Sequence, residues 1–180
     1  MILVIDLEAT CADDGSIESH EMEIIELAAV WATPAGDVRD ILQSFVRPVE
    51  HAQLTQFCTG LTHIQQTQVD AAPHWSTVAA DLAAFTRLHR GQYWGSWGNY
   101  DARQLERDCA RHGIASPLIG LAHINLKARF AKMRRIKQVG MATALRIVGL
   151  ELEGKHHRAV SDAQNIARLL PFSLCSFDKQ

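Results

Sequence analysis

Two acidic residues, Asp6 and Glu8, stand two positions apart at the end of the apolar run Ile2–Ile5. Residues two apart on a strand project from the same face, so these carboxylates would repel each other. A divalent cation relieves both the repulsion and the cost of burial beside an apolar core. The pair is therefore a candidate metal site, although a D-x-E spacing is common, and these acids could instead point to solvent or pair with an arginine.

Two further acids stand at predicted helix starts. Asp101 follows Trp97-Gly98-Asn99-Tyr100, and Asp162 follows Ser161. An acid in the first helical turn is stabilised by the helix dipole and needs no chemical role. Four acids at strand ends and helix starts could nevertheless converge on one point. Four carboxylates can hold two Mg²⁺ or Mn²⁺ ions about 3.5–4 Å apart, an arrangement that supports in-line phosphoryl displacement.

A general base for such chemistry is available close to the last acid. His157 lies five residues before Asp162, directly after His156. Imidazole titrates in the range that a base working near neutral pH requires. Because adjacent residues of an extended chain face opposite ways, we expect only one of the two histidines to face the site.

The elements that must position these residues read as one α/β domain over residues 1–180, with 47% hydrophobic and 21% charged residues. The continuous apolar run at the N-terminus predicts a central strand buried on both faces. Turn residues at 33–36 join two further strands into an antiparallel hairpin. Ser161 and Gln164 predict a capping box at the start of the last helix. The order of these elements predicts a mixed sheet with helices packed on it. The strands are expected at 2–5, 23–31, 41–46, 93–97 and 123–125, and the helices at 75–85, 102–112, 126–137, 141–148 and 161–170.

The charges are divided unevenly, although the formal net charge is only −2. Residues 1–101 carry 14 acids and 4 Lys or Arg, whereas residues 102–180 carry 6 acids and 14 Lys or Arg. This division favours an acidic cluster beside a basic surface, with chance composition as the alternative. Residues 126–137 hold six cations and no acid, which is typical of phosphate contact or of a solvated helix face. They are Lys127, Arg129, Lys132, Arg134, Arg135 and Lys137.

The four cysteines, Cys11, Cys58, Cys109 and Cys175, are scattered without a C-x-x-C pair. This spacing argues against a zinc site or a disulfide framework and favours a reducing, cytoplasmic setting. No apolar run approaches the roughly 18 residues that a membrane span needs. We therefore expect no membrane partner.

Three segments together resemble the exonuclease motifs of the DEDDh superfamily, and within it the Eri-type 3′ exoribonucleases. They are residues 6–11 (DLEATC), 97–101 (WGNYD) and 157–167 (HRAVSDAQNIA). Residues 23–26, 45–48, 57–65 and 69–70 match as well, so the resemblance spans residues 2–170. It implies an RNase H-like fold with a mixed five-stranded sheet, and removal of 5′-nucleotides from a 3′ end with two divalent metal ions, Mg²⁺ or Mn²⁺.

The resemblance also implies roles for individual residues. The metal carboxylates would be Asp6, Glu8, Asp101 and Asp162, and the general base would be His157 rather than His156. Arg158 stands where the tyrosine class of the superfamily has its phenol, which excludes that class. Substrate contacts would come from Glu8, Ala9 and Thr10 at the terminal ribose and from Phe57 and Tyr100 at the terminal base, with core packing as the alternative for the two aromatics.

Three positions depart from the family pattern. Leu7 replaces a frequent phenylalanine between the first two acids, and Ala159 and Ser161 replace a glycine and an aspartate in the last motif. None of these changes removes a ligand or the base. They affect the width of the loop that carries the base, and hence substrate preference.

The expected function is a metal-dependent 3′-5′ exonuclease acting on single-stranded RNA ends or short overhangs, with DNA as a further substrate. A non-catalytic RNA-binding or scaffold protein of the same fold is one alternative, but the presence of all four acids and the histidine argues against it. A DNA-directed proofreading-type subunit is another. It would need a partner-binding tail, for which residues 171–180 offer little.

Overall fold

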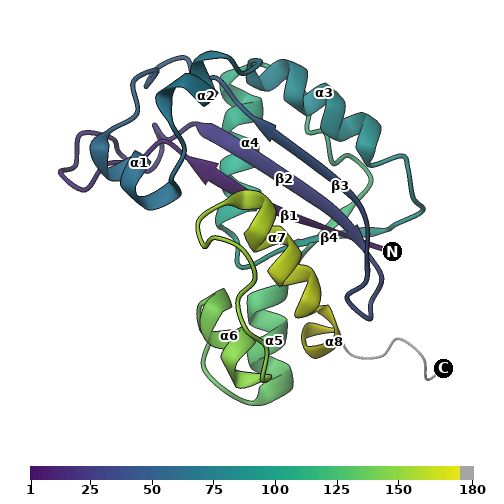
Figure 1. Cartoon of the computed structure of the whole chain (residues 1–180). Coiled ribbons are helices and arrows are strands. Elements are labelled where there is room, and N and C mark those ends of the chain that lie inside the picture. The colour runs from purple at the N-terminus through teal and green to yellow at the C-terminus, as the bar shows by residue number, and fades with distance from the viewer. Residues whose placement is uncertain (175–180) are drawn as a thin grey trace.

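The computed structural model describes residues 1–174, which form a five-stranded mixed sheet. Helices cover both faces of this sheet (Figure 1). The strand order is β3-β2-β1-β4-β5, so β1 is central, as predicted. β1 pairs antiparallel with β2, which continues into the predicted hairpin with β3, and parallel pairing joins β1 to β4 and β4 to β5. The strands are β1 (Ile2–Ala9), β2 (Ile24–Ala32), β3 (Val38–Phe45), β4 (Tyr93–Ser96) and β5 (Ala122–Asn125).

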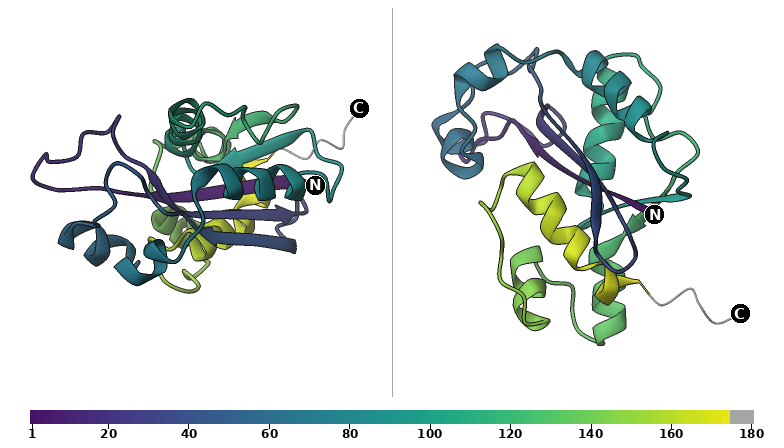
Figure 2. Two further views of the ribbon diagram at one scale, coloured as in Figure 1. Left: turned by 90° about the horizontal axis from the view of Figure 1, so that it is seen from above. Right: turned by 45° about the vertical axis from the view of Figure 1, so that its right-hand side comes forward.

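Alternation along β1 divides the core between the two faces of the sheet. Ile2 and Val4 pack with β2 residues against α5, α6, α7 and α8. Leu3 and Ile5 pack on the other face against α3 and α4. The two helical layers enclose the sheet in both views of Figure 2. The helices are α1 (Gln56–Thr62), α2 (Gln66–Asp70), α3 (Trp75–Phe85), α4 (Tyr100–Arg111), α5 (Leu126–Arg134), α6 (Met141–Ile147), α7 (Ala159–Arg168) and α8 (Leu170–Ser173).

The same alternation places the first two acids. Asp6 and Glu8 continue the series of Ile2 and Val4, so they face the layer that contains α7. Because β1 and β4 are parallel, their carboxyl ends lie at one edge of the sheet, where ligands commonly bind in open α/β sheets. A turn at Gly98, whose φ of 125° favours glycine, leads from β4 directly into α4 and brings Asp101 to this edge.

The last long helix, α7, begins earlier than predicted. It starts at Ala159, and the capping box expected from Ser161 and Gln164 is absent. The Ser161 hydroxyl instead accepts a hydrogen bond from the Lys155 N–H at 3.3 Å. The Ala159 N–H donates to the carboxylate of Glu26 on β2, at 3.1 Å. A tertiary acceptor has therefore replaced the local cap.

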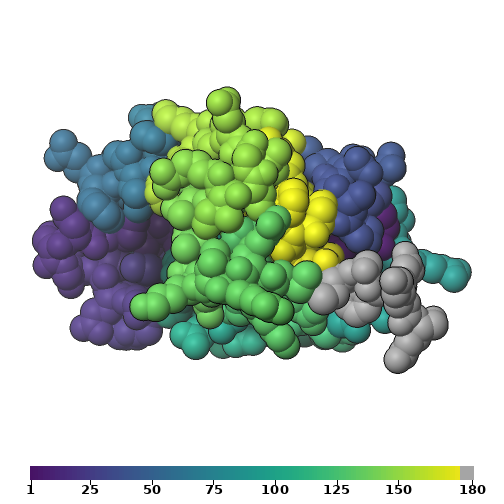
Figure 3. All heavy atoms as spheres, turned by 90° about the horizontal axis from the view of Figure 1, so that it is seen from below, coloured from purple at the N-terminus to yellow at the C-terminus, as the bar shows by residue number. Residues whose placement is uncertain are grey.

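The face opposite α3 carries the C-terminal helices. In Figure 3 the green residues of α5 and α6 cover the middle of the surface, with α8 in yellow beside them. Three short helices, α1, α2 and α8, were not predicted. Among residues 1–174, no helix is both long and apolar enough to cross a bilayer. Cys175 lies outside the described residues, and Cys11, Cys58 and Cys109 are free thiols.

Candidate active site

The structure brings the four acids together. Asp6, Glu8, Asp101 and Asp162 line one cavity of about 350 Å³ at the carboxyl end of β1. Carboxylate oxygens of Asp6, Glu8 and Asp162 lie within 4.8 Å of one another. Asp101 is tied to the same point, because its Oδ1 accepts a hydrogen bond from the Leu7 N–H at 3.1 Å. A central strand, the start of α4 and the first turn of α7 therefore converge on one acidic centre.

Burial and mutual repulsion make these carboxyl groups hard to ionise. Burial, followed by the charges of Asp101 and Glu8, holds the pKa of Asp6 well above its ordinary range. Burial, followed by the charge of Asp162, raises the pKa of Glu8 to about 8. Burial also raises the pKa of Asp101 to about 6 and shifts the pKa of Asp162 upward. Such a cluster favours a bound cation near neutral pH.

One atom of the cluster indicates where a cation fits. Asp162 Oδ2 accepts hydrogen bonds from His156 Nδ1 at 2.9 Å and from the His157 N–H at 3.0 Å. Asp162 Oδ1 is buried and has no hydrogen-bond partner among the described residues. Leaving a buried acceptor unpaired costs about 1–3 kcal/mol, and more for a charged group. The group of Asp6, Glu8 and Asp162 offers only oxygen donors and suits Mg²⁺ or Mn²⁺, while His156 and His157 form a second, mixed group with Asp162.

The raised pKa values predict that the metal-free protein loses stability as pH rises. The pKa of Glu8 is about 8 in the folded chain, against an ordinary value of 4.5. The folded state therefore binds the proton more tightly, so this contribution is complete below pH 4.5 and is lost as pH rises to 8. The pKa values of the other three acids are shifted in the same direction, so we expect a total loss of about a few kcal/mol and a fall in Tm of several degrees.

Scanning calorimetry in EDTA between about pH 5 and 8 measures this loss. Excess Mn²⁺ is expected to restore Tm, and to do so most strongly at the alkaline end, because the cation replaces the lost protons. A Tm in EDTA that is constant or increases over this interval would contradict the prediction.

Both neighbouring histidines face the cavity, so the expectation that only one could do so is wrong. His156 and His157 line it together, with ring centroids 4.0 Å apart and planes inclined by 15°. The expectation assumed an extended chain, whereas His157 has a left-handed backbone with φ of 59°. Burial and the adjacent His156 lower the pKa of His157, so its imidazole is neutral near pH 7 and able to accept a proton.

The predicted ribose and base contacts are placed unequally. Ala9 and Thr10 are buried outside the residues that line the cavity, and the Thr10 hydroxyl accepts from the Glu23 N–H at 2.9 Å. Tyr100 is 44% exposed and lines the cavity, whereas Phe57 is 39% exposed on α1 and does not line it. Core packing is therefore wrong for both aromatics.

Five further described residues complete the cavity wall: Leu7, Trp97, Gly140, Met141 and Ile166. Trp97 stands at the end of β4, and its indole N–H donates to the Val139 carbonyl at 3.0 Å. Gly140 and Met141 come from the start of α6, and Ile166 from α7. Trp97 could have been inferred from its place beside Gly98 and Asp101. The α6 residues carry no chemical signal in the sequence, since they contribute shape rather than charge.

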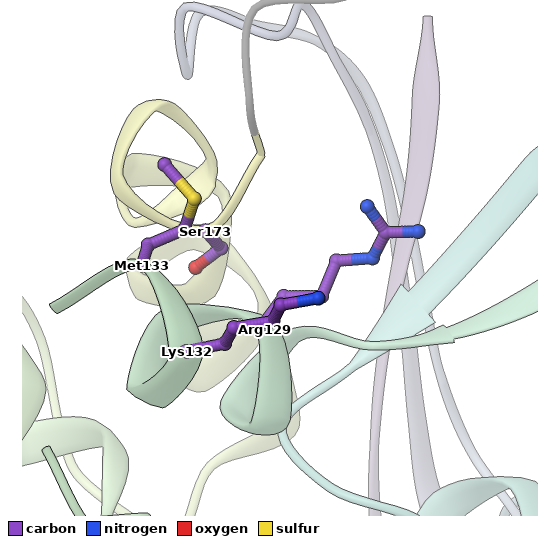
Figure 4. Close-up of a pocket in the computed structure, with 4 residues that line it drawn as sticks. All are labelled: Arg129, Lys132, Met133 and Ser173. Atoms are coloured by element: carbon purple, nitrogen blue, oxygen red, sulfur yellow. The ribbon is translucent and has the colours of Figure 1, made fainter. Parts of the chain in front are cut away.

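The basic residues of 126–137 do not share one surface. Lys127 lines a second cavity of about 390 Å³ that adjoins the acidic one through Tyr100. Arg129 and Lys132 line a separate cavity of about 300 Å³, where Ser173 of α8 faces α5 (Figure 4). Arg134 lies over the Phe172 and Phe130 rings, at 5.1 and 6.0 Å from their centroids, and Arg135 adopts the left-handed conformation that ends α5.

Two cations beside the acidic cavity lie outside any basic run in the sequence. Arg103 and Arg107 of α4 line the second cavity with Lys127, and none of the described residues that line it is acidic. Arg107 donates to the Ser19 carbonyl and to Gln104 Oε1. Their spacing of four residues places both on one side of α4, a helical pattern that could have been read from the sequence.

Comparisons with known proteins agree with this geometry. The family model for the RNase T exonucleases matches residues 3–170. Human ERI1 exoribonuclease 2 is 30% identical over 93% of this chain, which spans about a quarter (27%) of that protein's length. The crystal structure of the 3′hExo nuclease domain, a DEDDh family member bound to rAMP, superposes with a TM-score of 0.85. It is 26% identical in sequence and covers 93% of this chain and 88% of its own.

A structure describing 3′-end specific recognition of a histone mRNA stem-loop by a 3′-exonuclease has a TM-score of 0.86 and 26% identity, covering 93% of this chain and 78% of its own. The expected RNase H-like architecture is confirmed by these superpositions. With its family match, its fold and its clustered acids, the chain belongs to the RNase T family of exonucleases, within the DEDDh group.

Proposed function

We propose that this protein removes 5′-nucleotides one at a time from the 3′ ends of single-stranded RNA or short overhangs in the cytoplasm. The observation that carries the proposal is the cluster of Asp6, Glu8 and Asp162 oxygens within 4.8 Å, with Asp162 Oδ1 buried and unpartnered among the described residues. The RNase T family match and the similarity to exoribonucleases support the RNA preference. DNA remains a second substrate class for the same chemistry.

The carboxylates of Asp6, Glu8, Asp101 and Asp162 would hold two divalent ions, Mg²⁺ or Mn²⁺. When bound, such ions lower the pKa of the attacking water and stabilise charge on the leaving oxygen. His157 would accept the proton of that water, since its imidazole is neutral near pH 7. The Leu7 N–H orients Asp101, and the His157 N–H orients Asp162, so main-chain groups fix two of the four ligands.

Substrate would be held by groups that border the acidic cavity. Tyr100, exposed at its rim, is placed to stack on the terminal base, a contact worth about 1–3 kcal/mol. Glu8 would contact the terminal ribose, while Ala9 and Thr10 would contribute through main-chain atoms. Phe57 could stack on a base only if the bound substrate extended from the cavity toward α1. The cations of the second cavity would contact phosphates upstream of the scissile bond.

The decisive experiment uses 5′-labelled single-stranded RNA and DNA of the same sequence, incubated with Mg²⁺, Mn²⁺ or EDTA. We expect a ladder that shortens from the 3′ end, faster on RNA, and complete arrest in EDTA. Shortening that persists in EDTA, or that starts at the 5′ end, would contradict the proposal.

Replacing the cations of the second cavity is expected to weaken substrate binding rather than chemistry. Arg103→Ala and Lys127→Ala should each raise KM for an RNA of about 12 nucleotides several-fold and leave kcat within about twofold. Each lost phosphate contact should reduce the slope of log(kcat/KM) against log[salt] by about 0.7. Rates on a dinucleotide should hardly change, because its single internucleotide phosphate is the scissile one and it has no upstream phosphate for these cations to contact.

Two comparisons sharpen this measurement. Arg87→Ala removes an exposed cation after α3 and should leave the salt dependence unchanged. Arg129→Ala should do the same, because Arg129 lines the separate cavity beside α8. An equal loss of slope for Arg129→Ala and Lys127→Ala would instead indicate that substrate contacts the whole basic stretch.

A further inference from the structure

A fifth carboxylate, Glu26, lies beside the four acids but is fully occupied by other partners. It stands on β2 directly across from Glu8 and is 0% exposed. Its Oε1 accepts from Arg158 Nη2 at 3.0 Å and from Gln43 Nε2 at 2.9 Å. Its Oε2 accepts from Arg158 Nε at 3.0 Å and from the Ala159 N–H at 3.1 Å. With four donors on two oxygens, Glu26 is not free to bind a cation.

Arg158 connects this carboxylate to the base. It immediately follows His157 and precedes the first residue of α7. The planar guanidinium makes two parallel bonds to Glu26, a geometry that fixes direction as well as distance. It also lies 5.3 Å from the centroid of the Phe45 ring on β3. The loop end after His157 is thus anchored to two strands of the sheet.

The anchored segment carries backbone strain at His157, the proposed general base. His157 has φ of 59°, a left-handed conformation that non-glycine residues seldom adopt. Such a conformation persists where the surrounding contacts over-determine it, and it is concentrated at functional sites. The His157 N–H is held by Asp162 on one side, and Arg158 and Ala159 are held by Glu26 on the other.

We propose that Glu26 is a positioning residue of the exonuclease reaction, which acts through Arg158 to hold His157 in its left-handed conformation facing the acidic cavity. The inference rests on the proposed function for its kinetic test. Glu26 does not touch the reacting atoms. Its carboxylate is compensated by Arg158, so the contribution is orientation of the loop rather than charge at the cations.

The test is a double-mutant cycle on Glu26→Gln and Arg158→Met, assayed on single-stranded RNA with saturating Mn²⁺. Each single variant is expected to lower kcat about 10- to 100-fold, because a misplaced base loses part of the roughly 10²- to 10⁴-fold that general-base catalysis contributes. KM should stay within about threefold, because no substrate contact is removed. The double variant should be no slower than the worse single one, since both changes release the same loop. Arg158→Lys, which keeps the charge but loses the paired bonds, should recover only part of kcat.

A merely stabilising ion pair would behave differently. Val78→Ala opens a cavity in the core between α3 and the opposite face of the sheet, and this variant serves as the control for lost stability. It should lower Tm comparably and leave kcat unchanged at the assay temperature. If the Glu26 and Arg158 variants keep kcat within about twofold of the parent, or if their effects multiply in the double variant, the proposal is overturned.

Amide hydrogen exchange of Glu26→Gln gives a readout that does not need turnover. The amides of His157 and Ala159 should exchange at least about tenfold faster than in the parent, while those of β1 are unchanged. Unchanged protection of both amides would overturn the proposal even in an inactive protein. A parent without metal-dependent nuclease activity, together with faster exchange in the variant, would instead refute the proposed function and leave the loop anchor supported.

Discussion

Replacing Asp6 with asparagine is expected to lower kcat about 10³-fold or more and, in EDTA, to raise Tm. The side chain keeps its size and loses one negative charge at the centre of the acidic cavity. A cation bound there would supply several kcal/mol of transition-state stabilisation, and each loss of about 1.4 kcal/mol lowers the rate tenfold. In the absence of cations, burial and then the charges of Asp101 and Glu8 raise the pKa of this carboxyl group, so its ionisation destabilises the folded chain as pH rises.

The opposite signs of the two effects make the experiment informative. Rates on labelled RNA and calorimetric Tm at about pH 8 in EDTA and in Mn²⁺ should be measured on the same samples. Asp81→Asn, an exposed acid on α3, is the matched control and should change neither quantity. A variant of Asp6 that is both less active and less stable in EDTA would indicate a structural role for this carboxylate.

Removal of His157 is expected to have the second largest effect. His157→Ala should lower kcat about 10²- to 10⁴-fold, the range of a lost general base, with a much smaller change in KM. His156→Ala should lower kcat less, because His156 contacts Asp162 through Nδ1 rather than providing the proposed base. Instead it should shift the Mn²⁺ concentration required for half-maximal rate, since Asp162 loses one hydrogen-bond partner.

Titrating both variants with Mn²⁺ at saturating RNA separates these roles. His20→Ala, an exposed histidine near Glu18, is the control for loss of an imidazole. If His156→Ala proves the more damaging at all Mn²⁺ concentrations, the base assignment moves from His157 to its neighbour.

The acids could be placed from the sequence because their positions follow from local rules. A continuous apolar run ending in Asp6 and Glu8 predicts a central strand, and a period of two puts both acids on one face. An acid at the start of a helix, such as Asp101, is close to a strand end whenever the connection is short. These rules need no knowledge of distant contacts.

The remaining features depended on contacts between distant parts of the chain. Which histidines face the cavity is decided by the left-handed backbone at His157, and that conformation is held by Glu26 through Arg158. The helix α7 starts at Ala159 rather than at the predicted Ser161 for the same reason, since Glu26 accepts a hydrogen bond from the Ala159 N–H. The sequence of the helical segment alone does not indicate that its first N–H will bond to a residue on β2.

The basic stretch is divided between two cavities for a geometric reason. At 100° per residue, Lys127 lies on the side of α5 opposite Arg129 and Lys132, so one run of cations in sequence becomes two surfaces in space. Arg103 and Arg107 join Lys127 only because α4 and the start of α5 meet beside Tyr100. A run of charges in the sequence shows that a segment is basic, but the packing of the helices decides which of its side chains share a surface.

The anchoring of α7 on the sheet has a consequence for how the protein is made. Glu26 and Arg158 are separated by 132 positions, and the contact between Leu7 and Asp101 spans 94. Contacts of such long range form slowly and cannot form on a ribosome until the later partner has emerged. The acids of β1 therefore emerge from the ribosome long before the helix that completes their cavity. A nascent chain that ends before α7 lacks Asp162, so we expect it to be inactive as a nuclease until α7 has emerged and packed on the sheet.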